Sequence, residues 1–206
     1  MKVKVTPSKV HGNVKIPASK SMAHRALICA SLSDGTSIVS NVTNSKDIEA
    51  TVGCMKALGA NIKQINETTY EVTGTNLFKQ EGNITCNANE SGSTLRFLIP
   101  LAACTNAKVK FLGQGRLLQR PMDVYANEFK KQNIEFNQSN QEIIVSGNLK
   151  AKDYVVQGDI SSQFITGFMF VLPLLDQDST LTITEPYESK SYVNLTIQML
   201  AKFGIE

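Results

Sequence analysis

The feature that most constrains the fold is an internal repeat with a spacing of about seventy residues, because such repeats build one architecture from copies of one unit. Each copy opens with an extended segment, a serine-rich turn and an apolar helical stretch, at residues 12–32, 82–103 and 153–175. An extended β-branched segment and a second helix follow in each copy. Gly59, Asn133 and Gly204 then stand at equivalent places, where a left-handed helix cap favours Gly or Asn.

A hairpin completes the first two copies. Residues 62–74 and 134–147 alternate around a polar turn, whereas the third copy stops after two residues, which indicates a truncated chain. The helices that open the copies are apolar on nearly every side, 164–175 most of all, which predicts burial all round. We therefore predict an α/β fold in which residues 1–206 form one lobe of three βαβαββ repeats, with buried helices and outward-facing sheets. The repeats are predicted at about 12–74, 82–147 and 153–206, the last truncated.

The serine-rich turns at residues 19–21, 90–94 and 161–163 carry the functional signal. Ser and Thr commonly cap helices, and any one of these turns alone would be explained by capping. However, Lys20, Arg25 and Arg96 stand in or beside the first helical turns, where a cation opposes the helix dipole unless an anion is also present. Free N–H groups, hydroxyls and cations at a helix start bind anions. The three converging turns therefore predict a phosphate or carboxylate pocket, and Gly92 would allow close approach to the backbone.

Composition excludes several other classes of function. The net charge is only +3 and Lys and Arg are scattered, so no nucleic-acid footprint is visible. No stretch approaches the ~20 apolar residues of a membrane helix, and the N-terminus lacks a signal-peptide core. The four cysteines are far apart, and with only two histidines they predict no metal site. Cys29, Cys54 and Cys104 lie in apolar helical contexts, so we expect buried free thiols and a cytoplasmic protein.

Five motifs in order give the chain a specific resemblance. ASKSMAHRALICASL, ESGSTLRFL, GQGRLLQRPMD, GDISSQFITG and ESKSYVNLT resemble the N-terminal half of the 3-phosphoshikimate 1-carboxyvinyltransferase (EPSP synthase) family. The resemblance covers essentially the whole chain. It implies transfer of the enolpyruvyl group of phosphoenolpyruvate to shikimate 3-phosphate through a tetrahedral ketal, in a step toward chorismate, without metal or cofactor.

The resemblance also implies a division of labour between two lobes. The acid and base groups of the family come from a second lobe that is absent here, and residues 1–11 would form a strand that joins it. We expect this half to bind shikimate 3-phosphate weakly and to be inactive alone, and we expect a monomer whose partners are small anions and the missing lobe.

Site residues follow from the motif matches. The resemblance implies that shikimate 3-phosphate is bound by Lys20, Ser21, Arg25, Ser161, Ser162, Gln163, Ser189 and Tyr192. It implies that phosphoenolpyruvate is bound by Lys20, Gly92, Arg120 and Gln163. Arg96 also matches, although with a weaker claim to direct contact. Glu90 and Ser191 depart from the usual Asn and Pro, and His24 is interpreted as a packing residue. Gly92 predicts a site open to phosphonate analogues such as glyphosate.

Two other functions remain open. UDP-N-acetylglucosamine enolpyruvyl transferase shares the repeats and the donor, but it carries a reactive Cys in a mobile loop, whereas the loop before Arg120 has none. A non-catalytic anion-binding or RNA-binding module of related repeats is the second alternative. The absence of Trp and of a basic stripe argues against nucleic acid.

Overall fold

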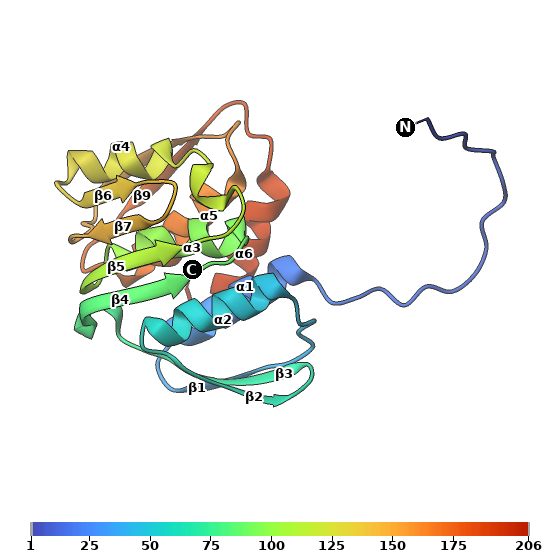
Figure 1. The fold of residues 1–206 in the computed structure, drawn as a ribbon, viewed down its shortest axis with the longest axis horizontal. Helices are drawn as coiled ribbons and strands as arrows, with labels where there is room; N and C mark the ends of the chain where they lie inside the picture. The colour runs from blue at the N-terminus through green and yellow to red at the C-terminus, as the bar shows by residue number, and fades with distance from the viewer. Residues whose placement is uncertain (1, 206) are drawn as a thin grey trace.

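The computed structural model describes residues 2–205, and the repeats of the sequence are visible in it as successive groups of helices and strands (Figure 1). The first group contains α1 (Lys20–Leu32), β1 (Thr36–Val39), α2 (Lys46–Ala57), β2 (Asn61–Asn66) and β3 (Thr69–Thr73). The 3-10 turn η1 (Leu77–Lys79) leads to the second, with β4 (Glu81–Asn87), α3 (Gly92–Ala102), β5 (Asn106–Leu112), η2 (Leu117–Gln119), α4 (Asp123–Lys131), β6 (Glu135–Gln138) and β7 (Ile143–Ser146). The third contains β8 (Asp153–Gln157), α5 (Ser162–Val171), η3 (Leu172–Leu174), β9 (Thr180–Thr184) and α6 (Lys190–Lys202).

Each repeat contributes its own small sheet. The strand orders are β1-β3-β2, β4-β5-β7-β6 and β8-β9. The pairs β4–β5 and β8–β9 are parallel, so each needs a crossover connection, and α3 and α5 supply it. β2–β3 and β6–β7 are antiparallel hairpins, which confirms the two hairpins predicted at 62–74 and 134–147.

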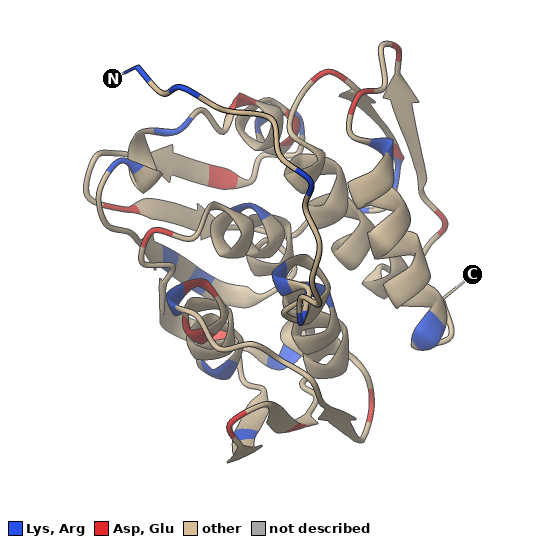
Figure 2. Cartoon of the chain, turned by 90° about the vertical axis from the view of Figure 1, so that its right-hand side faces the viewer, with Lys and Arg blue, Asp and Glu red and all other residues tan. Residues whose placement is uncertain are grey.

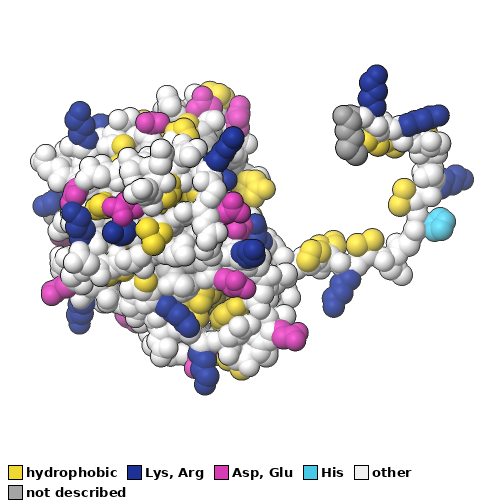
Figure 3. All heavy atoms as spheres, in the orientation of Figure 1, with side chains coloured by type: hydrophobic (Ala, Val, Ile, Leu, Met, Phe, Trp, Pro, Cys, Tyr) yellow, Lys and Arg dark blue, Asp and Glu magenta, His cyan; other side chains and the backbone are white. Residues whose placement is uncertain are grey.

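The first repeat departs from the predicted pattern at its start. Residues 12–16 form no strand, and residues 2–19 run away from the body as an extended segment (Figures 1 and 3). Val14 and Ile16 are 86% and 84% exposed. A strand exists only with a hydrogen-bonded neighbour, and this segment lies beside none, so the prediction of a strand here is wrong for the described chain. The predicted pairing of residues 1–11 with a second lobe stays a prediction, and Met1 lies outside the described residues.

The helices that open the repeats form the core. α3 packs against α5, α1 packs against α2 and α6, and the sheets lie on the outside (Figure 1). Phe97 of α3 meets Phe170 of α5 edge to face with ring centroids 5.6 Å apart, and both rings are buried. This arrangement confirms the prediction of buried helices and outward-facing sheets.

The apolar run 164–175 is not one helix buried on every side, as the sequence predicted. α5 ends at Val171, and Leu172, Leu174 and Leu175 are only partly buried in and after a 3-10 turn. Pro173 has no N–H to donate and its ring clashes with the preceding turn, which favours a break in the α-helix at this point.

The predicted caps and thiols are confirmed. Gly59, Asn133 and Gly204 have φ of 101°, 56° and 80°, the left-handed conformation expected after the second helix of each repeat. The four cysteines are free and buried. Across residues 2–205, every helix is too short or too polar to cross a membrane. Glu206 lies outside the described residues, so the predicted truncation of the third repeat stays a prediction.

Candidate anion-binding site

Four helices begin around one pocket of about 460 Å³. α1, α3, α5 and α6 come from all three repeats, and the equivalent turns of the repeats therefore converge as predicted. Figure 2 looks onto the side of the molecule from which residues 2–19 leave the body at the start of α1. The lining consists of Ser21, Arg25, Ser93, Arg96, Phe97, Arg120, Ser161, Ser162, Gln163, Ser189 and Tyr192.

The first turns of these four helices differ from those of α2 and α4 in their acidic residues. α1, α3, α5 and α6 have no acidic residue in the first turn. By contrast, α2 begins with Asp47 and Glu49, and α4 begins with Asp123. Acidic side chains stabilise a helix start, so their omission at one pocket leaves four positive dipole ends for an anionic ligand.

Serine hydroxyls cap three of the four helices. Ser19 accepts from Met22 N at 3.3 Å, Ser91 from Thr94 N at 3.2 Å, and Ser161 from Gln163 N at 3.4 Å. A helix start has four N–H groups without an intrahelical partner, and each capping hydroxyl satisfies one of them. The serine-rich turns can therefore both cap their helices and take part in anion binding, so the two explanations are compatible.

Three arginines give the pocket its charge. Arg96 Nη1 donates to Gln163 Oε1 at 2.7 Å, and Gln163 Nε2 donates to Ser93 Oγ at 2.9 Å. Burial, and after it the positive charge of Arg120, lowers the pKa of Arg96. Arg96 Nε is buried and has no hydrogen-bond partner among the described residues. The motif matches assigned Arg96 less weight than Arg120, yet both arginines line the pocket.

Arg25 lies at the floor of the pocket and ties three helices together. Arg25 is only 2% exposed, and its guanidinium donates to the hydroxyls of Thr196 and Thr166 at 2.8 and 3.3 Å. It also donates to the carbonyl oxygens of Ser21 and Tyr192 at 2.7 and 3.1 Å. Burial lowers its pKa to about 10, so it stays protonated at neutral pH. Arg25 therefore aligns the first turns of α1 and α6 and adds positive charge beneath the pocket.

Lys20 and Gly92 lie beside the pocket lining. Lys20 Nζ pairs with Asp47 Oδ2 at 2.5 Å, and Asp47 is a neighbour that the sequence analysis missed. An acid in the first turn of α2 is explained by the helix dipole, so the sequence contained no signal for this pair. Gly92 opens α3 within reach of two guanidiniums, since an added Cβ would lie 2.5 Å from Arg120 Nη1 and 3.5 Å from Arg96 Nη1. Glu90 is exposed, and its side chain lies next to Gly115.

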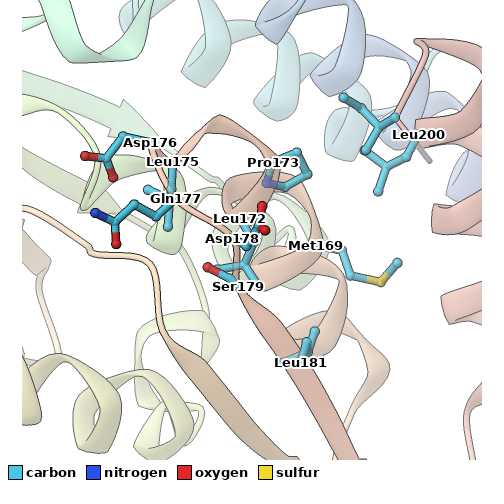
Figure 4. Close-up of a pocket in the computed structure, with 11 residues that line it drawn as sticks. Met169, Leu172, Pro173, Leu175, Asp176, Gln177, Asp178, Ser179, Leu181 and Leu200 are labelled. Atoms are coloured by element: carbon cyan, nitrogen blue, oxygen red, sulfur yellow. The ribbon is translucent and has the colours of Figure 1, made fainter.

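A larger hollow of about 580 Å³ lies between α5, η3, β9 and α6 (Figure 4). Its lining is largely apolar and includes Asp176 and Asp178, and no Lys or Arg is among its described residues. Two acids without a cation repel an anionic ligand, so this hollow does not compete for the predicted function.

A family model described as EPSP synthase (3-phosphoshikimate 1-carboxyvinyltransferase) matches residues 5–206. The chain belongs to the EPSP synthase family. A 3-phosphoshikimate 1-carboxyvinyltransferase of Clostridium perfringens (strain SM101 / Type A) is 48% identical over 206 residues, which cover 99% of this chain and 48% of that protein. One of Clostridium kluyveri is 49% identical over 205 residues, covering 98% and 48%.

Solved structures share the fold of this chain. An EPSP synthase from Acinetobacter baumannii aligns with a TM-score of 0.77 at 19% identity, over 95% of this chain and 44% of that one. The similarity to this structure is evidence of shared fold. The chain spans about half the length of the curated relatives it matches, so it corresponds to one part of an EPSP synthase.

Proposed function

We propose that the chain is the half of a 3-phosphoshikimate 1-carboxyvinyltransferase that binds shikimate 3-phosphate and helps to bind phosphoenolpyruvate. The whole enzyme would transfer the enolpyruvyl group of phosphoenolpyruvate to shikimate 3-phosphate, giving 5-enolpyruvylshikimate 3-phosphate and phosphate. One observation carries the proposal: four helix starts without acidic residues surround a pocket lined by three arginines. Both substrates are anions, and this site has the charge and the N–H donors to hold them.

Individual roles are proposed from the motif resemblance to the family, for residues that line or adjoin the pocket. Ser161, Ser162 and Gln163 at the start of α5, with Ser189 and Tyr192 at the start of α6, would hold the shikimate moiety and its phosphate. Gly92 and Arg120 would hold phosphoenolpyruvate, and the hydrogen bond from Arg96 would orient Gln163 between the two ligands. Lys20, Ser21 and Arg25 would complete the site from α1.

The chain alone is expected to bind without turning over substrate. The described residues that line the pocket include no Asp, Glu, His or Lys. Proton transfer requires an acid and a base within hydrogen-bond reach, and the proposed source of these groups is a second lobe. We further propose a cytoplasmic location, which is consistent with the four free buried thiols. We also propose that the protein is a monomer and that the reaction uses no metal or cofactor.

Calorimetric titration of the chain with shikimate 3-phosphate tests the proposal. We expect a Kd no weaker than about 1 mM, a negligible response to UDP-N-acetylglucosamine, and no phosphate release when phosphoenolpyruvate is added. With shikimate 3-phosphate saturating, Arg120→Met should weaken phosphoenolpyruvate binding at least about tenfold, since it removes a charge-assisted hydrogen bond. Arg116→Met is the matched control, because Arg116 is exposed in the same loop outside the pocket. Tighter binding of the UDP-sugar than of shikimate 3-phosphate would refute the assignment.

A further inference from the structure

A line of buried polar side chains runs beneath the pocket and is not explained by substrate contact. His24 Nδ1 lies 2.7 Å from Thr51 Oγ1, and Thr51 Oγ1 lies 2.7 Å from Thr94 Oγ1. Thr94 Oγ1 in turn lies 2.7 Å from Ser91 Oγ. We refer to these four residues as the His24–Ser91 network. All four are at most 1% exposed, so the network is closed to solvent in the described chain.

The network connects three helices close to their starts. His24 is on α1, one turn after Lys20, and Thr51 is on α2, one turn after Asp47. Ser91 is the N-cap of α3, and Thr94 Oγ1 also lies 3.3 Å from the carbonyl oxygen of Asp47. The network therefore lies directly below the Lys20–Asp47 pair on one side and the first turn of α3 on the other.

Stability alone does not require this arrangement. Replacing both partners of a buried hydrogen bond by apolar groups of the same shape is often nearly neutral, whereas a polar group left alone costs about 1–3 kcal/mol. What hydrogen bonds add to apolar packing is direction and a fixed distance. His24 is suited to this role because burial lowers its pKa to about 4, which keeps the ring neutral and the network unchanged at physiological pH.

We propose that His24, Thr51 and Thr94 are positioning residues that set the first turn of α3, and with it Gly92 and Ser93, relative to Lys20 on α1. The inference rests on the proposed function, since it concerns the same anion site. It gives His24 a role beyond packing. His24 fixes the first turn of α3 relative to Lys20 on α1 without touching the substrate.

Phosphoenolpyruvate affinity, measured by calorimetry on the chain with shikimate 3-phosphate saturating, tests the inference. Thr51→Val keeps shape and removes the central hydroxyl, and we expect it and His24→Leu to raise the Kd at least tenfold. His24→Asn should restore most of the affinity, because the Asn amide can occupy the place of Nδ1 and bond Thr51. In amide NMR spectra the signals of Gly92 and Ser93 should shift in Thr51→Val and in His24→Leu, and they should lie close to their wild-type positions in His24→Asn.

Thr105→Val is the matched control. Thr105 is a buried threonine beyond the other end of α3, and its hydroxyl donates to Ala102 O at 2.8 Å. It should lose stability comparable to Thr51→Val and bind phosphoenolpyruvate within twofold of wild type. Equal affinity of Thr51→Val and wild type, or an equal loss in Thr105→Val, overturns the inference even if His24→Leu fails to fold. Lack of binding by the wild-type chain is a separate outcome, which overturns the proposed function and this inference with it.

Discussion

Replacement of Gly92 by alanine should separate ligand binding from stability. Gly92 is the first residue of α3, is buried, and does not have a positive φ, so the backbone accepts an alanine without strain. The new Cβ would lie 2.5 Å from Arg120 Nη1, while ordinary contact begins at 3.4 Å. The guanidinium therefore has to move by about 0.9 Å. A displacement of this size breaks a hydrogen bond to any ligand oxygen that Arg120 reaches in its present position.

The expected magnitude follows from that bond. A hydrogen bond to a charged group contributes about 1.5–3 kcal/mol, which corresponds to a loss of roughly 10- to 150-fold in affinity. Stability should stay within about 1 kcal/mol of wild type and shift upward, because alanine favours a helix over glycine. The assay is calorimetric titration of phosphoenolpyruvate, and separately of glyphosate, with shikimate 3-phosphate saturating, accompanied by urea denaturation.

Gly53→Ala provides the control for this experiment. Gly53 is exposed within α2, and an added Cβ there would meet nothing within 4 Å. It should gain up to about 1 kcal/mol of stability and bind both ligands as wild type does. Phosphoenolpyruvate binding by Gly92→Ala within twofold of wild type would show that Arg120 does not hold the ligand in this geometry, and the assignment of Gly92 and Arg120 would be refuted.

Three further predictions address the rest of the chain. Arg25→Met should lower the free energy of unfolding in urea by about 3 kcal/mol, because it leaves several buried hydroxyl and carbonyl partners unsatisfied, whereas Arg116→Met should change it by less than about 0.5 kcal/mol. The folded-state pKa of His24, about 4, lies below its unfolded value of 6.5, so its contribution to stability is complete above pH 6.5 and is lost as pH falls to about 4. Urea titrations between these pH values should show a loss of about 3 kcal/mol in wild type that is absent in His24→Asn. Deletion of residues 2–11 should leave the unfolding free energy within about 0.5 kcal/mol, since this segment forms no helix or strand, and a larger loss would mean that it packs on the body.

The elements that the sequence predicted correctly have a local cause. Hairpins, left-handed caps and apolar helices depend on periodicity and on turn residues that neighbours along the chain determine, which is why Gly59, Asn133 and Gly204 could be placed. The prediction at residues 12–16 failed because an alternating pattern gives a segment the capacity to be a strand, while a neighbouring strand decides whether it becomes one. The helix predicted through 164–175 ended early because one proline outweighed the apolar character of the run.

The sequence by itself determined the repeat, the polar residues of the serine-rich turns, and the absence of acidic residues from the first turns of α1, α3, α5 and α6. Each of these features can be read from short segments of the chain. Only the tertiary structure decided how these segments combine. It showed that Arg96 orients Gln163 across 67 residues of sequence, and that Arg25 lies beneath the pocket with its hydrogen bonds made to α1, α5 and α6. It also joined His24 to Ser91 through two hydroxyls on other helices. Such contacts depend on how closely helices pack, and side-chain distances between segments far apart in a chain are set by that packing and by no local pattern.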